Sequence, residues 1–92
     1  MNDIWEAVAD KSRRQILSML KKKSMTAGEI AEHFSMSKPS ISHHLSILLS
    51  AGLITVEKEG QNRIYSVNMT VAQELIELVA KMTEKENKRS KK

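Results

Sequence analysis

The amino-acid sequence predicts a mainly α-helical fold with one β-hairpin, in the order of four helices, two strands and a final helix. Apolar residues recur at intervals of three and four along most of the chain, which is the spacing of amphipathic helices. Residues 54–67 instead alternate between apolar and polar around the turn-forming segment Glu59-Gly60-Gln61-Asn62, which indicates a hairpin. Residues that cap helix ends separate these segments.

The composition favours a single soluble domain. The chain has 92 residues and no cysteine, which excludes disulfides, thiolate metal ligands and a cysteine nucleophile. Residues 1–10 are acidic, and no apolar run approaches the roughly 18 residues of a membrane-spanning helix. We therefore expect a cytoplasmic protein with no secretory signal and no membrane span. Residues 1–84 are expected to form the domain, and the lysine-rich residues 85–92 a basic, disordered tail.

Positive charge is concentrated in the middle of the chain. Residues 11–63 carry nine Lys and Arg against four Asp and Glu, whereas residues 1–10 and 64–84 are net acidic. A local basic region attracts a polyanion even when the whole molecule has a formal charge of only +4.

The first two expected helices are short and amphipathic. Three apolar residues share one face of the first: Ile4, Trp5 and Val8. Asp10 or Ser12 can cap the second, which ends at the basic residues 21–23.

The next two helices are expected at 27–34 and 38–51. Thr26 and Glu29 form a capping box at the start of the first, and Ser37 can cap the second. About three residues join the two helices, which is the spacing of a helix-turn-helix. A hairpin directly after such a pair is a wing, so the sequence predicts a winged helix-turn-helix.

The chain beyond residue 51 contains two further helix signals. Gly52 is expected to end the fourth helix in the left-handed conformation. Thr70 and Gln73 are expected to form a second capping box, which opens a final helix. The apolar stripe of that helix consists of Val71, Leu75, Leu78 and Met82.

Residues 38–51 divide into two faces when they are placed on a helix. The apolar face consists of Ile41, Leu45 and Leu48, and the opposite face of Pro39, His43, Ser46 and Ser50. The first two turns are polar and the last two are apolar, as in a recognition helix whose start reads DNA and whose end packs against the body. Small hydroxyl side chains allow close approach, and Lys38 can reach a phosphate or a guanine.

Four stretches resemble the winged helix-turn-helix repressors of the ArsR/SmtB family, and the branch of autorepressors related to the sporulation-delaying-protein operon in particular. They are DKSRRQIL, MTAGEIAEHF, SKPSISHHLSILLSAGLI and EGQNRIYSVN. The resemblance covers about residues 3–80 and implies a homodimer that binds a palindromic operator in double-stranded DNA near its own promoter.

The resemblance also implies residue roles. The recognition helix would contact DNA through Ser37, Lys38, Pro39, Ser40, Ser42 and His43. The wing would contact DNA through Lys58, Gln61, Asn62 and Arg63. The first and last helices would form the dimer interface through Ile4, Trp5, Val8, Val71, Leu75 and Leu78.

The chain departs from the family in two places. Lys11 stands where a proline usually follows the aspartate. The paired cysteines near the third helix are absent, and the last helix, TVAQELIELVAKM, has no histidine. We therefore expect no metal sensing. We also expect no cofactor and no enzymatic activity.

Alternative interpretations remain beside these. Ser40 and Ser42 with His43 and His44 could form a nucleophile and base, but consecutive residues of a helix point about 100° apart. No Gly-rich oxyanion turn or orienting acid is apparent either, which disfavours catalysis. Glu29 and His33 lie four apart, but two such ligands are a weak metal signal. Arg13 and Arg14 could touch phosphates, or one of them could pair internally with an acid of the first helix.

Three further expectations concern single positions and the function as a whole. His44 is expected to make a structural hydrogen bond, and Tyr65 to pack at the base of the wing. The alternative function is a protein-interaction module. Release from DNA by a small ligand, by a regulatory partner protein or by simple competition also stays open.

Overall fold

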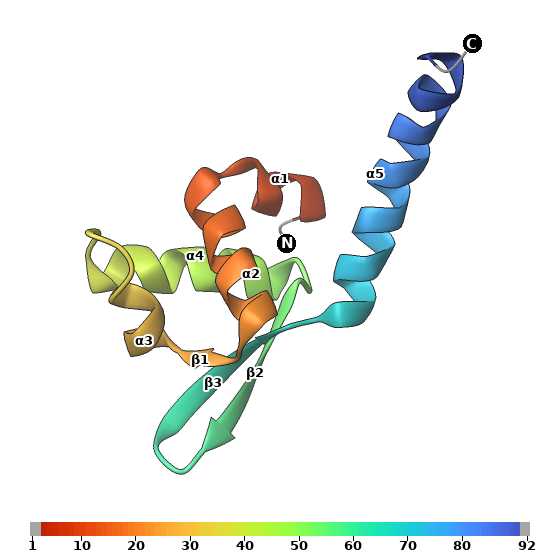
Figure 1. Ribbon diagram of the computed structural model, residues 1–92. Helices are drawn as coiled ribbons and strands as arrows, with labels where there is room; N and C mark the ends of the chain where they lie inside the picture. Colours follow the sequence, from red (N-terminus) through yellow and green to blue (C-terminus); the bar gives the residue numbers. More distant parts are fainter. Residues whose placement is uncertain (1–2, 91–92) are drawn as a thin grey trace.

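The computed structural model describes the backbone of residues 3–90 and the side chains of residues 3–83. Its elements are α1 (Ile4–Ala9), α2 (Lys11–Lys22), β1 (Met25–Thr26), α3 (Ala27–Ala31), α4 (Lys38–Ser50), β2 (Ile54–Glu59), β3 (Asn62–Val67) and α5 (Met69–Ser90). Figure 1 shows α1 to α4 gathered into one body, with the hairpin of β2 and β3 extending below it and α5 leading away to one side. The predicted fold class and the predicted order of elements are confirmed.

The start of the helix-turn-helix contains a strand that the sequence analysis did not predict. β1 pairs antiparallel with β3, so the sheet has three strands in the order β1-β3-β2. α3 ends at Ala31 and a turn follows it, so the helix predicted at 27–34 is three residues too long.

The N-terminal caps of α2 and α3 form as predicted. Of the two candidates for α2, Asp10 is the cap, and its Oδ2 accepts a hydrogen bond from the backbone N–H of Arg13 at 3.0 Å. At α3, Thr26 Oγ1 accepts from the N–H of Glu29 at 3.1 Å, and Glu29 Oε1 accepts from the N–H of Thr26 at 2.8 Å. Both halves of the capping box are therefore present.

The start of α5 differs from the prediction. Asn68 precedes the helix, and its Oδ1 accepts a hydrogen bond from the N–H of Val71 at 3.4 Å. The N–H of Asn68 donates to the carbonyl of Leu53 at 2.8 Å, which holds this cap against the end of α4. Thr70 lies inside the helix, so the predicted capping box of Thr70 and Gln73 is wrong. Asparagine fills the N-cap position at least as well as threonine does.

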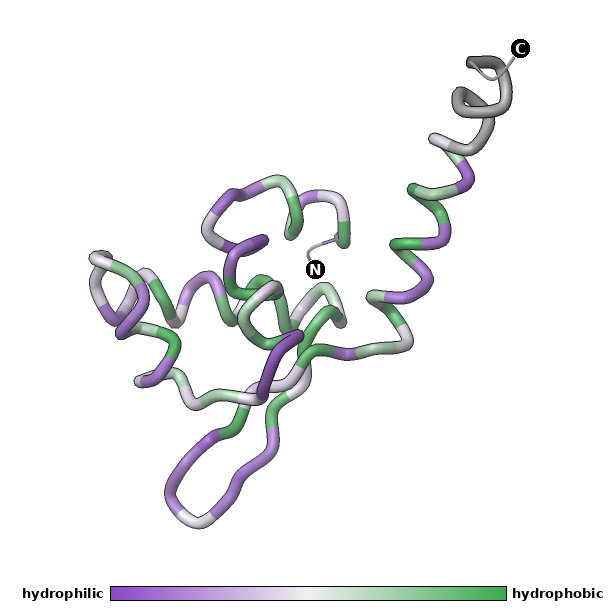
Figure 2. The backbone as a smooth tube through the Cα atoms, viewed as in Figure 1, coloured by the Kyte–Doolittle hydropathy of each residue, from purple (hydrophilic) through white to green (hydrophobic). Residues whose placement is uncertain are grey.

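The hydrophobic core lies where α1, α2, α3 and α4 meet the three-stranded sheet. It consists of Ala7, Ile16, Leu20, Met25, Ile30, Ile41, Leu45, Leu48, Leu53, Ile54 and Tyr65. The predicted apolar face of α4 is thus buried, and Tyr65 packs at the base of the wing as expected. Figure 2 shows apolar residues concentrated in this body and a hydrophilic hairpin tip.

α5 extends away from the body. The radius of gyration is 15.2 Å, whereas a compact chain of this length has about 12 Å. Figure 2 shows apolar residues at intervals along the free part of this helix. The predicted domain end at residue 84 and the basic tail 85–92 lie outside the residues whose side chains are described. None of the described helices is both long enough and apolar enough to span a membrane.

Candidate nucleic-acid interface

α4 begins at a serine cap that shapes its first turn. Ser37 Oγ accepts a hydrogen bond from the backbone N–H of Ser40 at 3.3 Å and donates one to Ser40 Oγ at 3.1 Å. Pro39 lies in this first turn, where its missing N–H would have no partner within the helix. The cap therefore fixes the start of α4 while its buried side anchors the helix in the core.

The six predicted contact residues of α4 lie on or beside its outer face. Ser40 is half-buried, and the exposed ones are Ser37, Lys38, Pro39, Ser42 and His43. No acidic residue occurs between Lys38 and Ser50, and the helix N-terminus adds a partial positive charge. The face of α4 that would meet a ligand therefore suits a polyanion.

The wing ends in a two-residue turn. Gly60, the first of the two turn residues, has φ +64°, as the first central residue of a type II′ turn requires. The second, Gln61, does not have positive φ, which also fits this turn type. The register sets Lys58 opposite Arg63 and Glu59 opposite Asn62. All four predicted wing residues, Lys58, Gln61, Asn62 and Arg63, are exposed around this tip.

A cleft joins the outer side of α4 to the wing. It has a volume of about 320 Å³ and is lined by Ser42, Leu45, Ser46, Leu49, Arg63 and Tyr65. Two predicted contact residues from different elements, Ser42 and Arg63, therefore line the same cleft. Ser46 and Tyr65 were not predicted as contact residues, although Ser46 was expected to face outward. No sequence pattern indicates that the wing folds over this side of α4.

Arg13 and Arg14 both bind the C-terminal end of α1. Arg13 donates from Nε to the carbonyl of Ala7 at 2.8 Å, and Arg14 donates from Nη1 to the carbonyl of Val8 at 2.8 Å. The internal alternative is thus the observed one, but the partners are backbone carbonyls rather than an acidic side chain. Arginines in this position replace the hydrogen bonds that the last turn of a helix lacks.

His44 makes the structural hydrogen bond that was expected. Its Nδ1 lies 3.2 Å from Nη1 of Arg13 and 4.0 Å from Oδ2 of Asp10. The backbone N–H of Arg13 holds the pKa of the Asp10 carboxyl below its usual range, and the charge of Arg13 acts in the same direction.

Of the two residues Glu29 and His33, whose spacing left a metal site open, Glu29 has another role in the structure. Glu29 is committed to the capping box, and the hydrogen bond from Thr26 lowers the pKa of its carboxyl. Within the described part of the chain, no three His, Asp or Glu side chains are grouped so that they could hold a metal ion.

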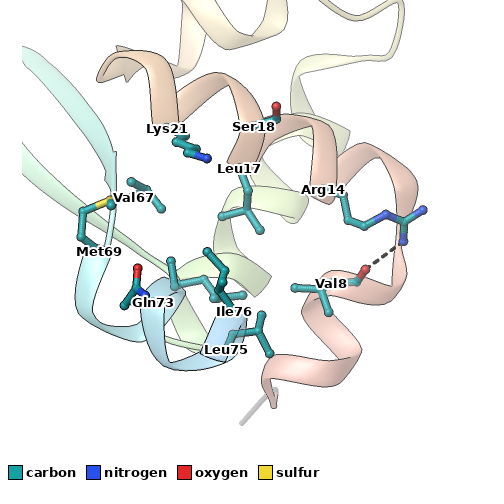
Figure 3. Close-up of a pocket in the computed structure, with 12 residues that line it drawn as sticks. Val8, Arg14, Leu17, Ser18, Lys21, Val67, Met69, Gln73, Leu75 and Ile76 are labelled. Atoms are coloured by element: carbon teal, nitrogen blue, oxygen red, sulfur yellow. Dashed lines mark hydrogen bonds between the residues drawn. The ribbon is translucent and has the colours of Figure 1, made fainter. Parts of the chain in front are cut away.

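An open apolar cavity of about 400 Å³ lies between the body and the first turns of α5 (Figure 3). Its walls include Val8 from α1, Leu17 from α2, and Leu75 and Ile76 from α5. Figure 3 shows these four side chains pointing toward one another across the cavity. The cavity thus brings together residues from both ends of the chain, including two predicted for the dimer interface, Val8 and Leu75.

The predicted dimer residues are only partly covered. Ile4, Val8, Val71 and Leu75 are half-buried, whereas Trp5 is 52% exposed and Leu78 is 45% exposed. Ile76 and Val79, which the predicted stripe left out, are also exposed apolar residues of α5. The predicted stripe of α5 took only apolar residues spaced three or four apart. It was too narrow, because Ile76 and Val79 widen the apolar face of the helix.

Known proteins resemble this chain in sequence and in structure. The family model described as "Bacterial regulatory protein, arsR family" matches residues 10–56. The transcriptional repressor SdpR of Bacillus subtilis (strain 168) is 54% identical over 76 residues, which cover 83% of this chain and 84% of SdpR. An arsenical resistance operon repressor of Staphylococcus aureus is 31% identical over 77 residues, which cover 84% of this chain and 74% of that protein.

The structure also resembles solved structures of transcriptional regulators. A crystal structure described as a possible transcriptional regulator for arsenical resistance has a TM-score of 0.79 and 32% identity, and the match covers 89% of this chain and 85% of the other. The family indicated by the sequence motifs is thereby confirmed. Taken with the helix-turn-helix and its wing, these matches show that the chain belongs to the ArsR family of bacterial transcriptional regulators.

Proposed function

We propose that this protein is a transcriptional repressor that binds a palindromic operator in double-stranded DNA as a homodimer, near its own promoter. In each protomer the start of α4 enters the major groove, and the wing contacts the flanking backbone or minor groove. The observation that carries this proposal is the cleft between α4 and the wing, where Ser42 and Arg63 lie together beside an outer face without acids.

The chemistry of this surface supports DNA as the ligand. Lys38 and Arg63 supply positive charge for phosphates, and hydroxyl groups such as that of Ser42 can approach a base edge or a phosphate closely. His43 is exposed on the second turn of α4, where residues of a recognition helix reach bases. The similarity to SdpR, which is named a transcriptional repressor, supports repression as the outcome of binding.

The exposed apolar side of α5 supports the homodimer. Helices with such a face are stable in water only when another apolar surface covers it. Residues of α1 and α5 share the cavity of Figure 3, so a second copy can cover both helices through one two-fold interface. Two-fold symmetry then sets the two copies of α4 roughly 34–36 Å apart, in successive major grooves.

We propose that the repressor is not a metal sensor. The chain has no cysteine and no histidine in α5, and Glu29 is occupied by the capping box. A repressor acts where the DNA is, so we place the protein in the cytoplasm.

The test compares binding to a labelled DNA fragment from upstream of its own gene with binding to a scrambled fragment, by fluorescence anisotropy at two salt concentrations. We expect tighter binding to the native fragment, two protomers per site, and affinity that falls steeply with salt. Equal and weak binding to both fragments would overturn the proposal. Capture of a protein partner that survives excess DNA would then favour the interaction module.

A further inference from the structure

We infer that Arg13 is a positioning residue that ties the recognition helix to the end of α1, so that the dimer-forming helix sets how α4 meets DNA. This inference rests on the proposed function and deepens it. It concerns a side chain that does not lie on the DNA-facing surface itself. The groups involved are Nε, Nη1 and Nη2 of the Arg13 guanidinium and the carboxylate of Asp10.

The guanidinium of Arg13 joins two helices that are far apart in the sequence. Nε donates to the carbonyl of Ala7 at 2.8 Å, and Nη2 donates to the carbonyl of Glu6 at 3.1 Å. Nη1 lies 3.2 Å from Nδ1 of His44, which belongs to α4. One planar cation of α2 therefore holds the last turn of α1 with one edge and the recognition helix with the other.

The direction of the third hydrogen bond is fixed by chemistry. A guanidinium can only donate, so Nδ1 of His44 is the acceptor of this hydrogen bond. Oδ2 of Asp10 lies 4.0 Å from the same Nδ1 and also caps α2. The carboxylate thus balances the charge of Arg13 at the point where α1, α2 and α4 meet.

The hydrogen bond between Arg13 and His44 is directional, and it constrains the rotation of α4 in a way that the core contacts of this helix do not. Ile41, Leu45 and Leu48 fix how deeply α4 is buried, but apolar contacts are non-directional and resist a small rotation of the helix only weakly. The hydrogen bond from Arg13 to His44 opposes such a rotation. His44 directly follows His43, and the two ring centroids are 6.2 Å apart, so a rotation at one moves the other.

The other end of this connection is the proposed dimer interface. α1 carries Trp5, which is half-exposed, and its last turn is the one that Arg13 holds. A continuous series of contacts therefore leads from the proposed partner subunit to α1, from α1 to Arg13, and from Arg13 to His44, which lies beside the proposed DNA-contacting residues of α4. A change at the interface can reach α4 through this route.

Arg14 provides a matched control. It binds the same helix end, with Nη1 2.8 Å from the carbonyl of Val8 and 2.9 Å from the carbonyl of Ala9. Among the described residues the hydrogen bonds of its side chain go to α1 alone. Replacing either arginine by methionine removes hydrogen bonds to α1, but only Arg13→Met also removes the link to α4.

The experiment measures selectivity, which is the ratio of affinities for the native and the scrambled DNA fragments at one salt concentration. We expect Arg13→Met and His44→Leu each to lower this ratio about tenfold, as for the loss of one hydrogen bond to a charged group. Arg14→Met should leave the ratio within about twofold, and so should His44→Gln, whose amide oxygen can still accept from Arg13. The double variant Arg13→Met/His44→Leu should lose no more than either single one, because both remove the same bond.

Sedimentation and circular dichroism show whether each variant is still a folded dimer. If Arg13→Met retains full selectivity, or if Arg14→Met loses as much, the inference is overturned and both arginines merely stabilise α1. If Arg13→Met does not fold, the comparison of His44→Leu with His44→Gln tests the inference instead. Equal selectivity of these two variants overturns the inference. A wild-type protein that does not distinguish the fragments overturns the proposed function, and the inference falls with it.

Discussion

Met25 lies directly opposite Tyr65 in the pairing of β1 with β3, and both side chains are buried. Met25 comes just before the helix-turn-helix, whereas Tyr65 belongs to the wing. On its other side Tyr65 pairs with Val56 of β2. The central strand of the sheet therefore links the wing to the chain that enters α3, and the orientation of the wing depends on this contact.

Replacing Met25 by alanine should destabilise the protein and loosen the wing. We expect the free energy of unfolding to fall by about 2 kcal/mol, because the change leaves a cavity in the core. Val56→Ala is the control, since Val56 pairs with the same tyrosine but is 39% exposed, and it should cost less than about 1 kcal/mol. Urea unfolding measures both values. Equal costs for the two variants would show that burial against Tyr65 does not anchor the wing.

The recognition helix and the wing should respond differently to substitution. His43→Ala should relax base preference at one position of each half-site, whereas Arg63→Ala should weaken binding to all sequences alike. Arg63→Ala should also reduce the slope of log affinity against log salt by about one. Anisotropy titrations on single-base variants of the native fragment measure these effects. Unchanged binding in both variants would mean that the reading surface lies elsewhere.

A charge on the apolar side of α5 should separate the dimer. Leu78 is 45% exposed, and burial of a leucine side chain is worth about 1.5–3 kcal/mol, counted twice in a two-fold interface. Leu78→Lys should therefore raise the dimer dissociation constant more than about tenfold. Glu77→Lys is the matched control at the adjacent exposed position and should change it little. Sedimentation equilibrium decides, and a dimer that survives Leu78→Lys would place the interface on another surface.

Gly52 should be replaceable only by residues that accept a left-handed backbone. Its φ is +79°, and the N–H of Leu53 donates to the carbonyl of Leu48 as the end of a Schellman motif. No atom lies within 4 Å of a Cβ added at Gly52, so the cost of Gly52→Ala comes from backbone strain, at about 1 kcal/mol. Gly52→Asn should cost less, since asparagine visits this conformation more readily. Thermal unfolding measures both variants, and a larger loss for Gly52→Asn would contradict the explanation.

Acid should destabilise the fold through its helix caps. Hydrogen bonds from backbone N–H groups hold the pKa of Asp10 below its ordinary value of 3.8 and that of Glu29 below 4.5. Each carboxyl binds fewer protons in the folded state, so its stabilisation is complete above the ordinary pKa and is lost as the pH falls through the folded pKa. We expect stability to decrease below about pH 4.5. The double variant Asp10→Asn/Glu29→Gln should show a shallower decrease in urea unfolding, and an equal decrease would assign the acid sensitivity to other groups.

Most features that depend on neighbouring residues were predictable from the sequence, although the capping box predicted at Thr70 and Gln73 was wrong. The capping box of Thr26 and Glu29, the cap at Ser37 and the stop at Gly52 each involve atoms within a few residues of one another. The hairpin follows in the same way from a two-residue turn between alternating segments. The sequence by itself therefore determined the order of the predicted elements, the buried face of α4 and the family resemblance. Each of these features leaves a periodic or fixed-distance pattern of residues in the chain.

Tertiary structure alone decided the contacts between distant segments. β1 has only two residues and exists because β3, some forty positions away, pairs with it. The partners of Arg13 were open in the sequence, since a long cation can reach a phosphate or a carbonyl equally well, and only the packing of α1 and α4 brought those acceptors within reach. The cleft that both Ser42 and Arg63 line likewise depends on how the wing packs beside α4. Such contacts leave no periodic pattern, because the residues that make them become neighbours only when the helices pack.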